Sequence, residues 1–344
     1  MNPSRHRDAS DRLPRNSRRT DSGHGREPSG LLEGRVTRAY GRQLVVEDVA
    51  GVPHPCRTFG KDLRVVCGDR VGFLPEAAGS GVGLVHAIRP RKGVLARWSM
   101  AGQPEVLAAH VTRLVVVFAP LPVPDFHVVD RYLAAAALGR FEAVVVCTKS
   151  DLLVPPVRQA PADALSAALA EYRSLGYPTF LLDTRCAAGF AELAAQLAQG
   201  TSVLVGQSGV GKSSLLNRLV PAAAAAIGEV SDSTDEGRHT TTSASLHRLP
   251  GGGEVIDSPG VRDFSPPVPD PREARLGYVE VAALGSGCRF LDCLHREEPG
   301  CAVRLAVGEP PAAGLPPLSA RRYASYRRLL NIALQMAERR PGGR

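Results

Sequence analysis

The chain has 344 residues, of which 44% are apolar, and a formal net charge of +8. This length predicts two or three domains, and the apolar content excludes a wholly disordered protein. No apolar run approaches the ~18 to 20 residues that cross a bilayer, and the first 30 residues hold no apolar signal core, so a cytoplasmic protein with no membrane partner is expected. The basic balance favours an anionic partner without saying which one.

Residues 1–29 are rich in Arg, Ser, Asp and Gly and contain almost nothing to bury, which predicts a disordered, mildly basic tail. Composition leaves two roles open for this tail, a solvated segment without function and a loose contact with RNA.

Residues 30–92 carry short β-like runs at 44–46, 63–66, 71–74 and 82–88, separated by glycine-containing turns. This spacing predicts a small OB-like β-barrel, although an SH3-like barrel has the same periodicity. Basic residues outnumber acidic ones here, which favours contact with nucleic acid over a merely solvated surface. They are Arg35, Arg38, Arg42, Arg57, Lys61, Arg64 and Arg70.

An α/β domain is expected over 93–272. Continuous apolar runs at 113–118 and 143–147 are typical of strands that are covered on both faces of a parallel sheet. Helices are expected at 128–138, 161–175 and 191–197, with further strands at 180–182, 203–205 and 254–256.

A glycine-rich segment with the spacing G-x-x-x-x-G-K-S follows the run at 203–205 and precedes a helical pattern. Its glycines can turn backbone N–H groups onto a phosphate, while Lys212 reaches the β/γ oxygens and Ser213 ligates Mg²⁺. A chance glycine loop is disfavoured because the flanking strand and helix are both predicted. The expected nucleotide-binding residues are Gly206, Gln207, Ser208, Gly209, Val210, Gly211, Lys212, Ser213 and Ser214.

The strand at 143–147 is followed by Thr148, Lys149, Ser150 and Asp151. This tetrapeptide resembles the guanine-recognition motif of GTPases, usually Asn-Lys-x-Asp, in which the aspartate accepts from the N1–H and the exocyclic amine of guanine. A plain surface turn is the alternative. Thr148 departs from the usual Asn, so its contacts with the purine and the backbone are open.

Asp257 and Gly260 form a D-x-x-G pattern after the strand at 254–256, with Asp257 expected near Mg²⁺ and Gly260 near the γ-phosphate. One of the threonines at 240–242 is expected to be the switch residue. Val261 stands where Ras-like enzymes have a water-orienting glutamine, so another group must position the water. His239 is the nearest candidate for this catalytic role, and a solvent-exposed loop histidine is the alternative.

Four residues with metal-ligating side chains lie close together in the last domain, predicted at 273–344: Cys288, Cys293, His295 and Cys301. Three thiolates and one imidazole can close a tetrahedral Zn²⁺ site, and four protein ligands leave no open position for catalysis. A single structural zinc ion is therefore predicted. The other cysteines, Cys56, Cys67, Cys147 and Cys186, are expected to be small buried residues.

The segment 318–334 is predicted to be an amphipathic helix whose tyrosines and leucines pack into a core. Four arginines among them are expected to stay available for phosphates. They are Arg321, Arg322, Arg327 and Arg328.

The order of these motifs is unusual, because the guanine motif at 148–151 precedes the phosphate loop at 206–213. This order indicates a circularly permuted GTPase domain. Through this motif order, the spacing of the predicted zinc ligands and the predicted barrel, the chain resembles the RsgA (YjeQ) family of circularly permuted GTPases that depend on the small ribosomal subunit. The resemblance covers about residues 31–336.

The resemblance implies a GTPase that binds the small ribosomal subunit and its rRNA and acts in late maturation of that subunit. It implies hydrolysis of GTP to GDP and phosphate with Mg²⁺, stimulated by the subunit, and it places the family's catalytic histidine at His239. A monomer is expected. Two alternatives from other classes remain, a P-loop ATPase or kinase and a nonenzymatic RNA-binding assembly protein.

Overall fold

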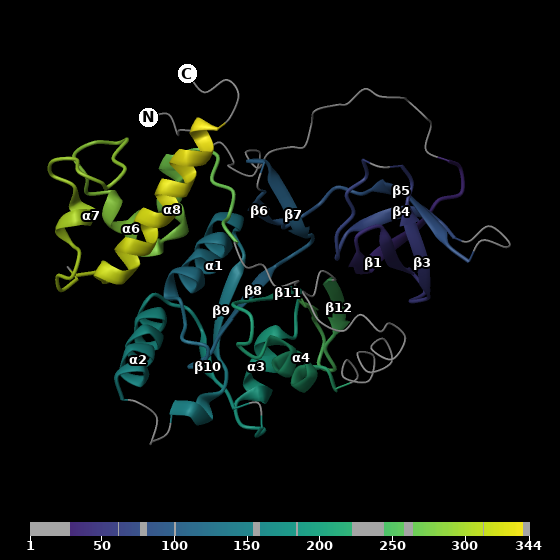
Figure 1. The fold of residues 1–344 in the computed structure, drawn as a ribbon, viewed down its shortest axis with the longest axis horizontal. Coiled ribbons are helices and arrows are strands. Elements are labelled where there is room, and N and C mark those ends of the chain that lie inside the picture. Colours follow the sequence, from purple (N-terminus) through teal and green to yellow (C-terminus); the bar gives the residue numbers. More distant parts are fainter. Residues whose placement is uncertain are drawn as a thin grey trace, which may run out of the picture.

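The structure, a computed structural model, describes residues 28–60, 62–75, 81–99, 101–153, 159–183, 185–221, 244–257, 264–311 and 313–339. Within these stretches the chain forms a β-barrel, an α/β sheet with helices on both faces, and a C-terminal group of helices. These three parts lie next to one another, with the α/β sheet between the other two (Figure 1). The predicted multidomain fold is confirmed. The helices described here are all too short or too polar to cross a membrane.

The barrel has five strands in the order β1-β2-β3-β5-β4, and a further pairing of β1 with β4 closes the ring. They are β1 (Leu32–Tyr40), β2 (Gln43–Asp48), β3 (Pro53–Thr58), β4 (Arg70–Leu74) and β5 (Gly83–Ile88). Alternate residues such as Val36, Val46 and Phe73 are fully buried inside the ring. Five strands in a closed barrel fit the predicted OB-like architecture.

The strand predicted at 63–66 is wrong. Residues of this segment make no strand ladder; instead the fully buried carboxylate of Asp69 accepts from the Val66 amide at 2.9 Å and pairs with Arg91 at 2.7 Å. Strands β1 and β3 were not predicted from the sequence. In β1 charged residues interrupt the apolar ones, and β3 contains two prolines, which lower β propensity.

Between the barrel and the sheet lies a two-stranded hairpin, β6 (Leu95–Trp98) and β7 (Pro104–Ala108), which was not predicted. It forms a separate small sheet that connects the two larger parts (Figure 1).

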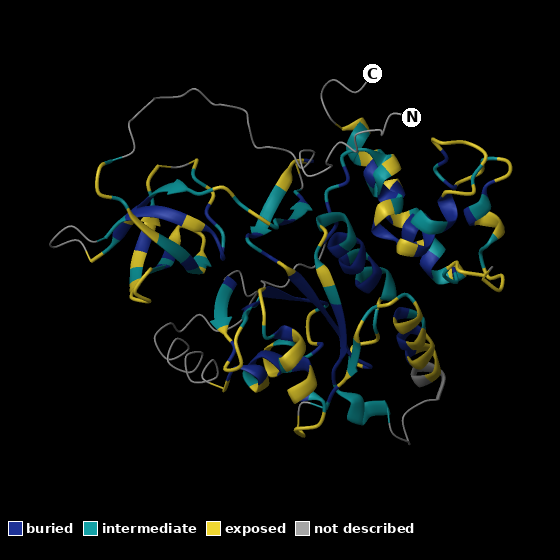
Figure 2. Cartoon of the chain, turned by 180° about the vertical axis from the view of Figure 1, so that it is seen from behind, coloured by how far each residue is buried: buried dark blue, intermediate teal, exposed yellow. Residues whose placement is uncertain are grey.

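The α/β sheet has the order β10-β9-β8-β11-β13-β12, in which only β12 is antiparallel to its neighbour. Its strands are β8 (Arg113–Phe118), β9 (Glu142–Cys147), β10 (Thr179–Leu181), β11 (Thr201–Val205), β12 (Ala244–Arg248) and β13 (Glu254–Asp257). The predicted strands at 113–118, 143–147 and 254–256 are confirmed, and β12 was missed. Figure 2 shows these strands largely buried between half-exposed helices.

Helices cover both faces of the sheet: α1 (Phe126–Gly139) and α2 (Gln159–Ser174) on one side, α3 (Phe190–Leu197) and α4 (Lys212–Leu219) on the other. A 3-10 turn, η2 (Ser150–Leu153), follows β9. Leu114 and Val116 of β8 face α1 and α2, whereas Val115 and Val117 face α3 and α4. This alternation buries β8 on both faces, which explains its continuous apolar sequence.

The barrel is joined to the sheet through β1, which pairs with β12 at the sheet edge. Arg35 of β1 also forms an ion pair with Glu254 of β13 at 2.6 Å and donates to the Thr201 hydroxyl at 3.0 Å. The two parts therefore share one continuous run of strands.

The C-terminal part contains the 3-10 helix η3 (Pro271–Gly277), α6 (Val279–Gly285), α7 (Ala302–Leu305) and the long α8 (Ala320–Glu338). Helix α8 confirms the helix predicted at 318–334, and Ser319 caps its first turn by accepting from the Arg322 amide at 3.1 Å. Tyr326 and Leu330 are buried in its core, as predicted. Of the four cysteines predicted to be buried, Cys186 is exposed.

Candidate functional site

The phosphate loop runs from the end of β11 to the start of α4. Gly206, Gly209 and Gly211 have φ angles of 146°, 77° and 90°, which favour glycine. A Cβ atom on Gly206 would lie 2.0 Å from the carbonyl oxygen of Val117. The loop can therefore pass this close to β8 only with glycine at that position.

Lys212 begins α4 and folds back over the loop. Its Nζ donates to the carbonyl oxygens of Gly206 at 2.9 Å and Gln207 at 2.8 Å. Burial lowers the pKa of Lys212, and the carboxylate of Asp257 opposes this shift. The ammonium group thus lies over the loop, where the motif requires it to meet phosphates.

Asp257 lies at the carboxyl end of β13, level with Leu204 of the neighbouring strand β11. Burial raises the pKa of Asp257, and the charge of Lys212 lowers it. Ser213 is exposed at the second position of α4. A phosphate-bound Mg²⁺ ion fits this donor set, because a carboxylate and a hydroxyl are hard oxygen ligands.

The predicted guanine motif meets the phosphate loop, although Thr148 and Val210 are 62 positions apart in the chain. The Thr148 hydroxyl donates to the Val210 carbonyl oxygen, and Lys149 donates from Nζ to the Gly209 carbonyl oxygen at 2.7 Å. Lys149 also donates to the Leu121 carbonyl oxygen at 2.8 Å. Threonine in place of asparagine thus still makes a contact with the loop backbone.

Asp151 forms an ion pair with Arg185 at 2.9 Å, and Arg185 also pairs with Asp183 at 2.9 Å. Arg185 lies after β10, and no motif in the sequence pointed to it. The guanidinium group occupies one oxygen of the carboxylate that would read guanine, so base binding must compete with this ion pair.

Several predicted site residues lie outside the described part of the chain. They are Gly260, His239 and the threonines at 240–242.

The four predicted metal ligands come together: the ligand atoms of Cys288, Cys293, His295 and Cys301 all lie within 4.8 Å of one another. The Sγ atoms of Cys288 and Cys301 are 3.9 Å apart, and they lie 3.4 and 3.5 Å from Nδ1 of His295. Tetrahedral zinc with ordinary bond lengths spaces sulfur atoms about 3.8 Å apart and sulfur from nitrogen about 3.6 Å. The cluster therefore has the size of a metal site.

The surroundings of His295 also fit a metal ligand. Its ring is buried, and a Cβ atom on Gly285 would lie 3.2 Å from its Nε2, so glycine leaves room for the ring. Burial raises the pKa of the Cys293 thiol to about 12, an environment that favours a bound cation over a bare thiolate. Four protein ligands form a closed site, which is typical of structural metal.

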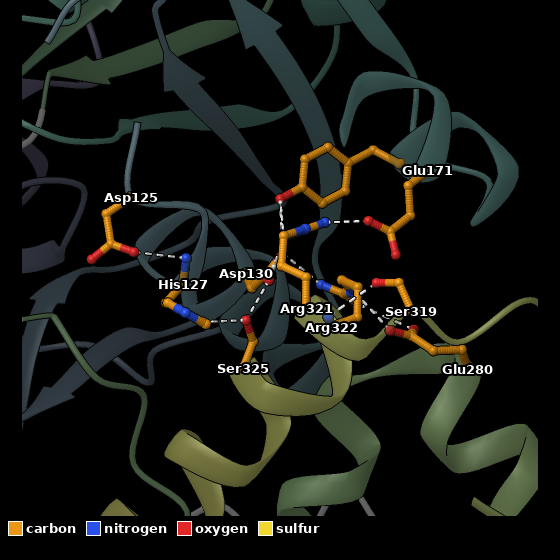
Figure 3. A network of polar contacts seen from close by, with 10 residues as sticks. Asp125, His127, Asp130, Glu171, Glu280, Ser319, Arg321, Arg322 and Ser325 are labelled. Carbon is orange, nitrogen blue, oxygen red and sulfur yellow. Dashed lines mark hydrogen bonds and ion pairs between the residues drawn. The ribbon is translucent and has the colours of Figure 1, made fainter. Parts of the chain in front are cut away.

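A buried polar network joins this metal-binding part to the nucleotide-binding part (Figure 3). Asp130 of α1 accepts from Arg322 at 2.9 Å, from Arg321 at 2.7 Å and from the Ser325 hydroxyl at 2.6 Å. Arg322 also donates to Glu280 of α6 at 2.6 Å. The prediction that Arg321 and Arg322 stay available for phosphates is therefore wrong, because both guanidinium groups are paired inside the interface.

The fold and site define a P-loop GTPase whose guanine motif precedes its phosphate loop, with a barrel before it and, after it, a helical part whose Cys3His cluster could hold a metal ion. The sequence model of the RsgA GTPase family matches residues 88–266. The chain belongs to this family, as the sequence motifs predicted.

Curated relatives extend the likeness over most of the chain. "Small ribosomal subunit biogenesis GTPase RsgA" of Azotobacter vinelandii is 40% identical over 320 residues, 92% of this chain and 90% of that protein. The Pseudomonas aeruginosa protein of the same name is 37% identical over 316 residues, again 92% and 90%.

Solved structures with a similar fold also cover most of the chain. YjeQ from Thermotoga maritima matches with a TM-score of 0.63 and 25% identity, covering 88% of this chain and 99% of that one. YloQ, described as a circularly permuted GTPase, matches with a TM-score of 0.62 and 26% identity, covering 93% and 99%.

Proposed function

We propose that this chain binds the small ribosomal subunit through its rRNA and acts in late maturation of that subunit, hydrolysing GTP to GDP and phosphate with stimulation by the subunit. The observation that carries the proposal is identity of 37–40% over 92% of the chain with proteins named for this process. That span includes the barrel and the metal-binding part as well as the GTPase domain.

The geometry of the described residues supports the nucleotide roles that we propose. Residues 206–214 cradle the phosphates, Lys212 neutralises the β/γ oxygens, and Asp151 reads guanine after Arg185 moves aside. Thr148 and Lys149 position this aspartate by fastening its loop to the phosphate loop. Mg²⁺, when bound through Ser213 and near Asp257, supplies charge neutralisation on the phosphates.

His239 remains our proposal for the group that orients the attacking water, with Gly260 near the γ-phosphate and one of the threonines at 240–242 as the switch residue. The metal of the Cys3His cluster is proposed to be zinc, since thiolate and imidazole ligands in a closed tetrahedral set favour it. A cytoplasmic monomer is the form in which we expect the protein to act.

The proposal is tested by GTP hydrolysis with small subunits, large subunits or neither, for the wild type and His239→Ala. Stimulation by small subunits alone, lost in the variant, is expected. Stimulation that survives the substitution would keep the ribosomal role and move water positioning to another residue. Equal rates under all conditions would contradict the proposed function. If unlabelled ATP displaced labelled GTP from the protein as well as unlabelled GTP does, the ATPase or kinase class would be favoured.

A further inference from the structure

A cavity of about 290 Å³ lies between α1 and α8, where the nucleotide-binding and metal-binding parts meet. Helix α1 contributes His127 and Arg131, which are one helical turn apart. Helix α8 contributes Ser325, Arg328 and Ile332 from one face. Neither the nucleotide site nor the metal cluster uses this cavity.

The lining of the cavity is positively charged. Among the residues that the structure describes, neither Arg131 nor Arg328 has an ion-pair partner, and the buried Nε of Arg131 has no hydrogen-bond acceptor. The one carboxylate in the lining, Asp125, already accepts from the backbone amide of His127 at 2.9 Å as the helix cap. A guanidinium nitrogen withdrawn from water without an acceptor costs free energy unless a ligand supplies one.

His127 adds a third group, which can donate to an anion when its Nε2 is protonated. Its Nδ1 lies 2.7 Å from the Ser325 hydroxyl, and that hydroxyl gives its only proton to Asp130 at 2.6 Å. Nδ1 must therefore be the donor in its own bond, which leaves Nε2 as the nitrogen that changes protonation. Burial lowers the pKa of His127, and the nearby charge of Arg328 lowers it further. A bound anion would oppose this effect of Arg328.

We propose that this cavity binds a backbone phosphate of the small subunit's RNA, an inference that rests on the proposed function. Two planar guanidinium groups match phosphate oxygens in charge and geometry. The donors of the lining and the net charge of +8 suit an anion, and RNA is favoured over an acidic peptide because Ile332 is the one aliphatic side chain in the lining, which leaves little surface for apolar peptide side chains. The volume is about ten times the ~30 Å³ share of a water molecule, enough for a phosphate and adjoining sugar.

The cavity lies next to a residue that contacts the phosphate loop. The backbone amide of Asp125, which caps α1 at the cavity edge, donates to the Gln207 side chain of the phosphate loop at 3.2 Å. RNA held here would touch the helix whose first residues contact that loop.

The test compares the Arg131→Gln/Arg328→Gln double variant with Arg304→Gln/Arg339→Gln, which removes the same charge from exposed arginines away from the cavity. Affinity for purified small subunits, and for protein-free RNA extracted from them, is measured over a range of salt concentrations. GTP binding serves as the check that each variant is folded.

The cavity variant is expected to lose about tenfold or more in affinity for both probes, and the control much less. If both arginines hold one phosphate, the slope of log affinity against log salt falls by about 0.7 to 0.9. Unchanged affinity of the cavity variant, or a loss no larger than in the control, would overturn the inference. A wild type that binds neither probe would instead refute the proposed function.

Two further outcomes would assign the cavity to another ligand. Loss of affinity for intact subunits with normal binding of the extracted RNA would identify an acidic protein group as the occupant. Stabilisation of the wild type by inorganic phosphate, absent in the cavity variant and accompanied by normal RNA affinity, would identify free phosphate. Either result would overturn the proposal.

Discussion

Arg322 donates to Asp130 at 2.9 Å, and both side chains are completely buried. One belongs to the last helix and the other to the first helix of the α/β sheet, so the bond joins segments 192 positions apart. Glu280 shares the same guanidinium group. This buried charge network lies in the interface between the metal-binding part and the GTPase domain, beside apolar packing of Ala134 against Tyr278.

Replacing Arg322 with Met should therefore destabilise the protein strongly. The substitution leaves Glu280 buried without its ion-pair partner, which costs about 3–5 kcal/mol of the free energy of unfolding. The matched control is Arg272→Met, because Arg272 pairs with Asp270 at an exposed site and its loss should cost less than about 1 kcal/mol. Urea unfolding measures both, and similar losses for the two variants would contradict the central role of the network.

The same network predicts a pH dependence. Burial raises the pKa of Asp130, but Arg322 and Arg321 outweigh burial and hold that pKa below its ordinary value of 3.8. A carboxylate with a depressed folded pKa stabilises the fold above its ordinary pKa, and this contribution is lost as pH falls below 3.8 through the folded pKa. The difference in free energy of unfolding between the wild type and Asp130→Asn should therefore be largest at pH 7 and shrink as the pH falls below 3.8. A gap that is constant with pH in urea unfolding would refute this.

Metal removal should loosen the C-terminal part. Elemental analysis is expected to find one zinc ion per chain, lost in Cys301→Ser, and chelation should lower Tm because the four ligands crosslink this part of the fold. Cys186→Ser is the control, since Cys186 is exposed and does not belong to the cluster. Wild-type protein that purifies without metal and ignores chelators would contradict the assignment.

Asp151→Asn should change base specificity. The amide cannot accept from both N–H groups of guanine, so GTP affinity should fall by about two orders of magnitude. Xanthosine triphosphate should gain affinity, because its base carries an oxygen where guanine has the amine. Asp183→Asn is the control, as Asp183 pairs with the same Arg185 but stands outside the motif, and GTP affinity should stay within about threefold. Equal effects of the two substitutions would argue against base recognition by Asp151.

Gly206→Ala should disable the phosphate loop. The added methyl group would lie 2.0 Å from a backbone oxygen of β8, and shifting that strand or the loop costs on the order of 1–3 kcal/mol. Binding of a fluorescent GTP analogue should weaken accordingly. Gly251→Ala, where a methyl group meets nothing within 4 Å, should change neither binding nor Tm. Normal nucleotide binding by Gly206→Ala would show that the loop adjusts.

Local spacing by itself determined the chemistry of this protein. The phosphate loop, the guanine motif and the Cys3His set are read from the sequence because each needs particular residue types at short, regular intervals. Their order along the chain also predicted the permutation. Helix α8 and the buried strand β8 followed from their hydrophobic periodicity.

Tertiary structure alone decided which charged groups are paired. Nothing near Arg185 in the sequence points to Asp151, and the arginines of α8 look alike as neighbours on one helix. Packing against α1 buries Arg322 and leaves Arg328 exposed beside the cavity. The partners of Arg322 are supplied by residues distant in the chain, and burial makes a charge depend on those partners, so these outcomes could not be read from local pattern.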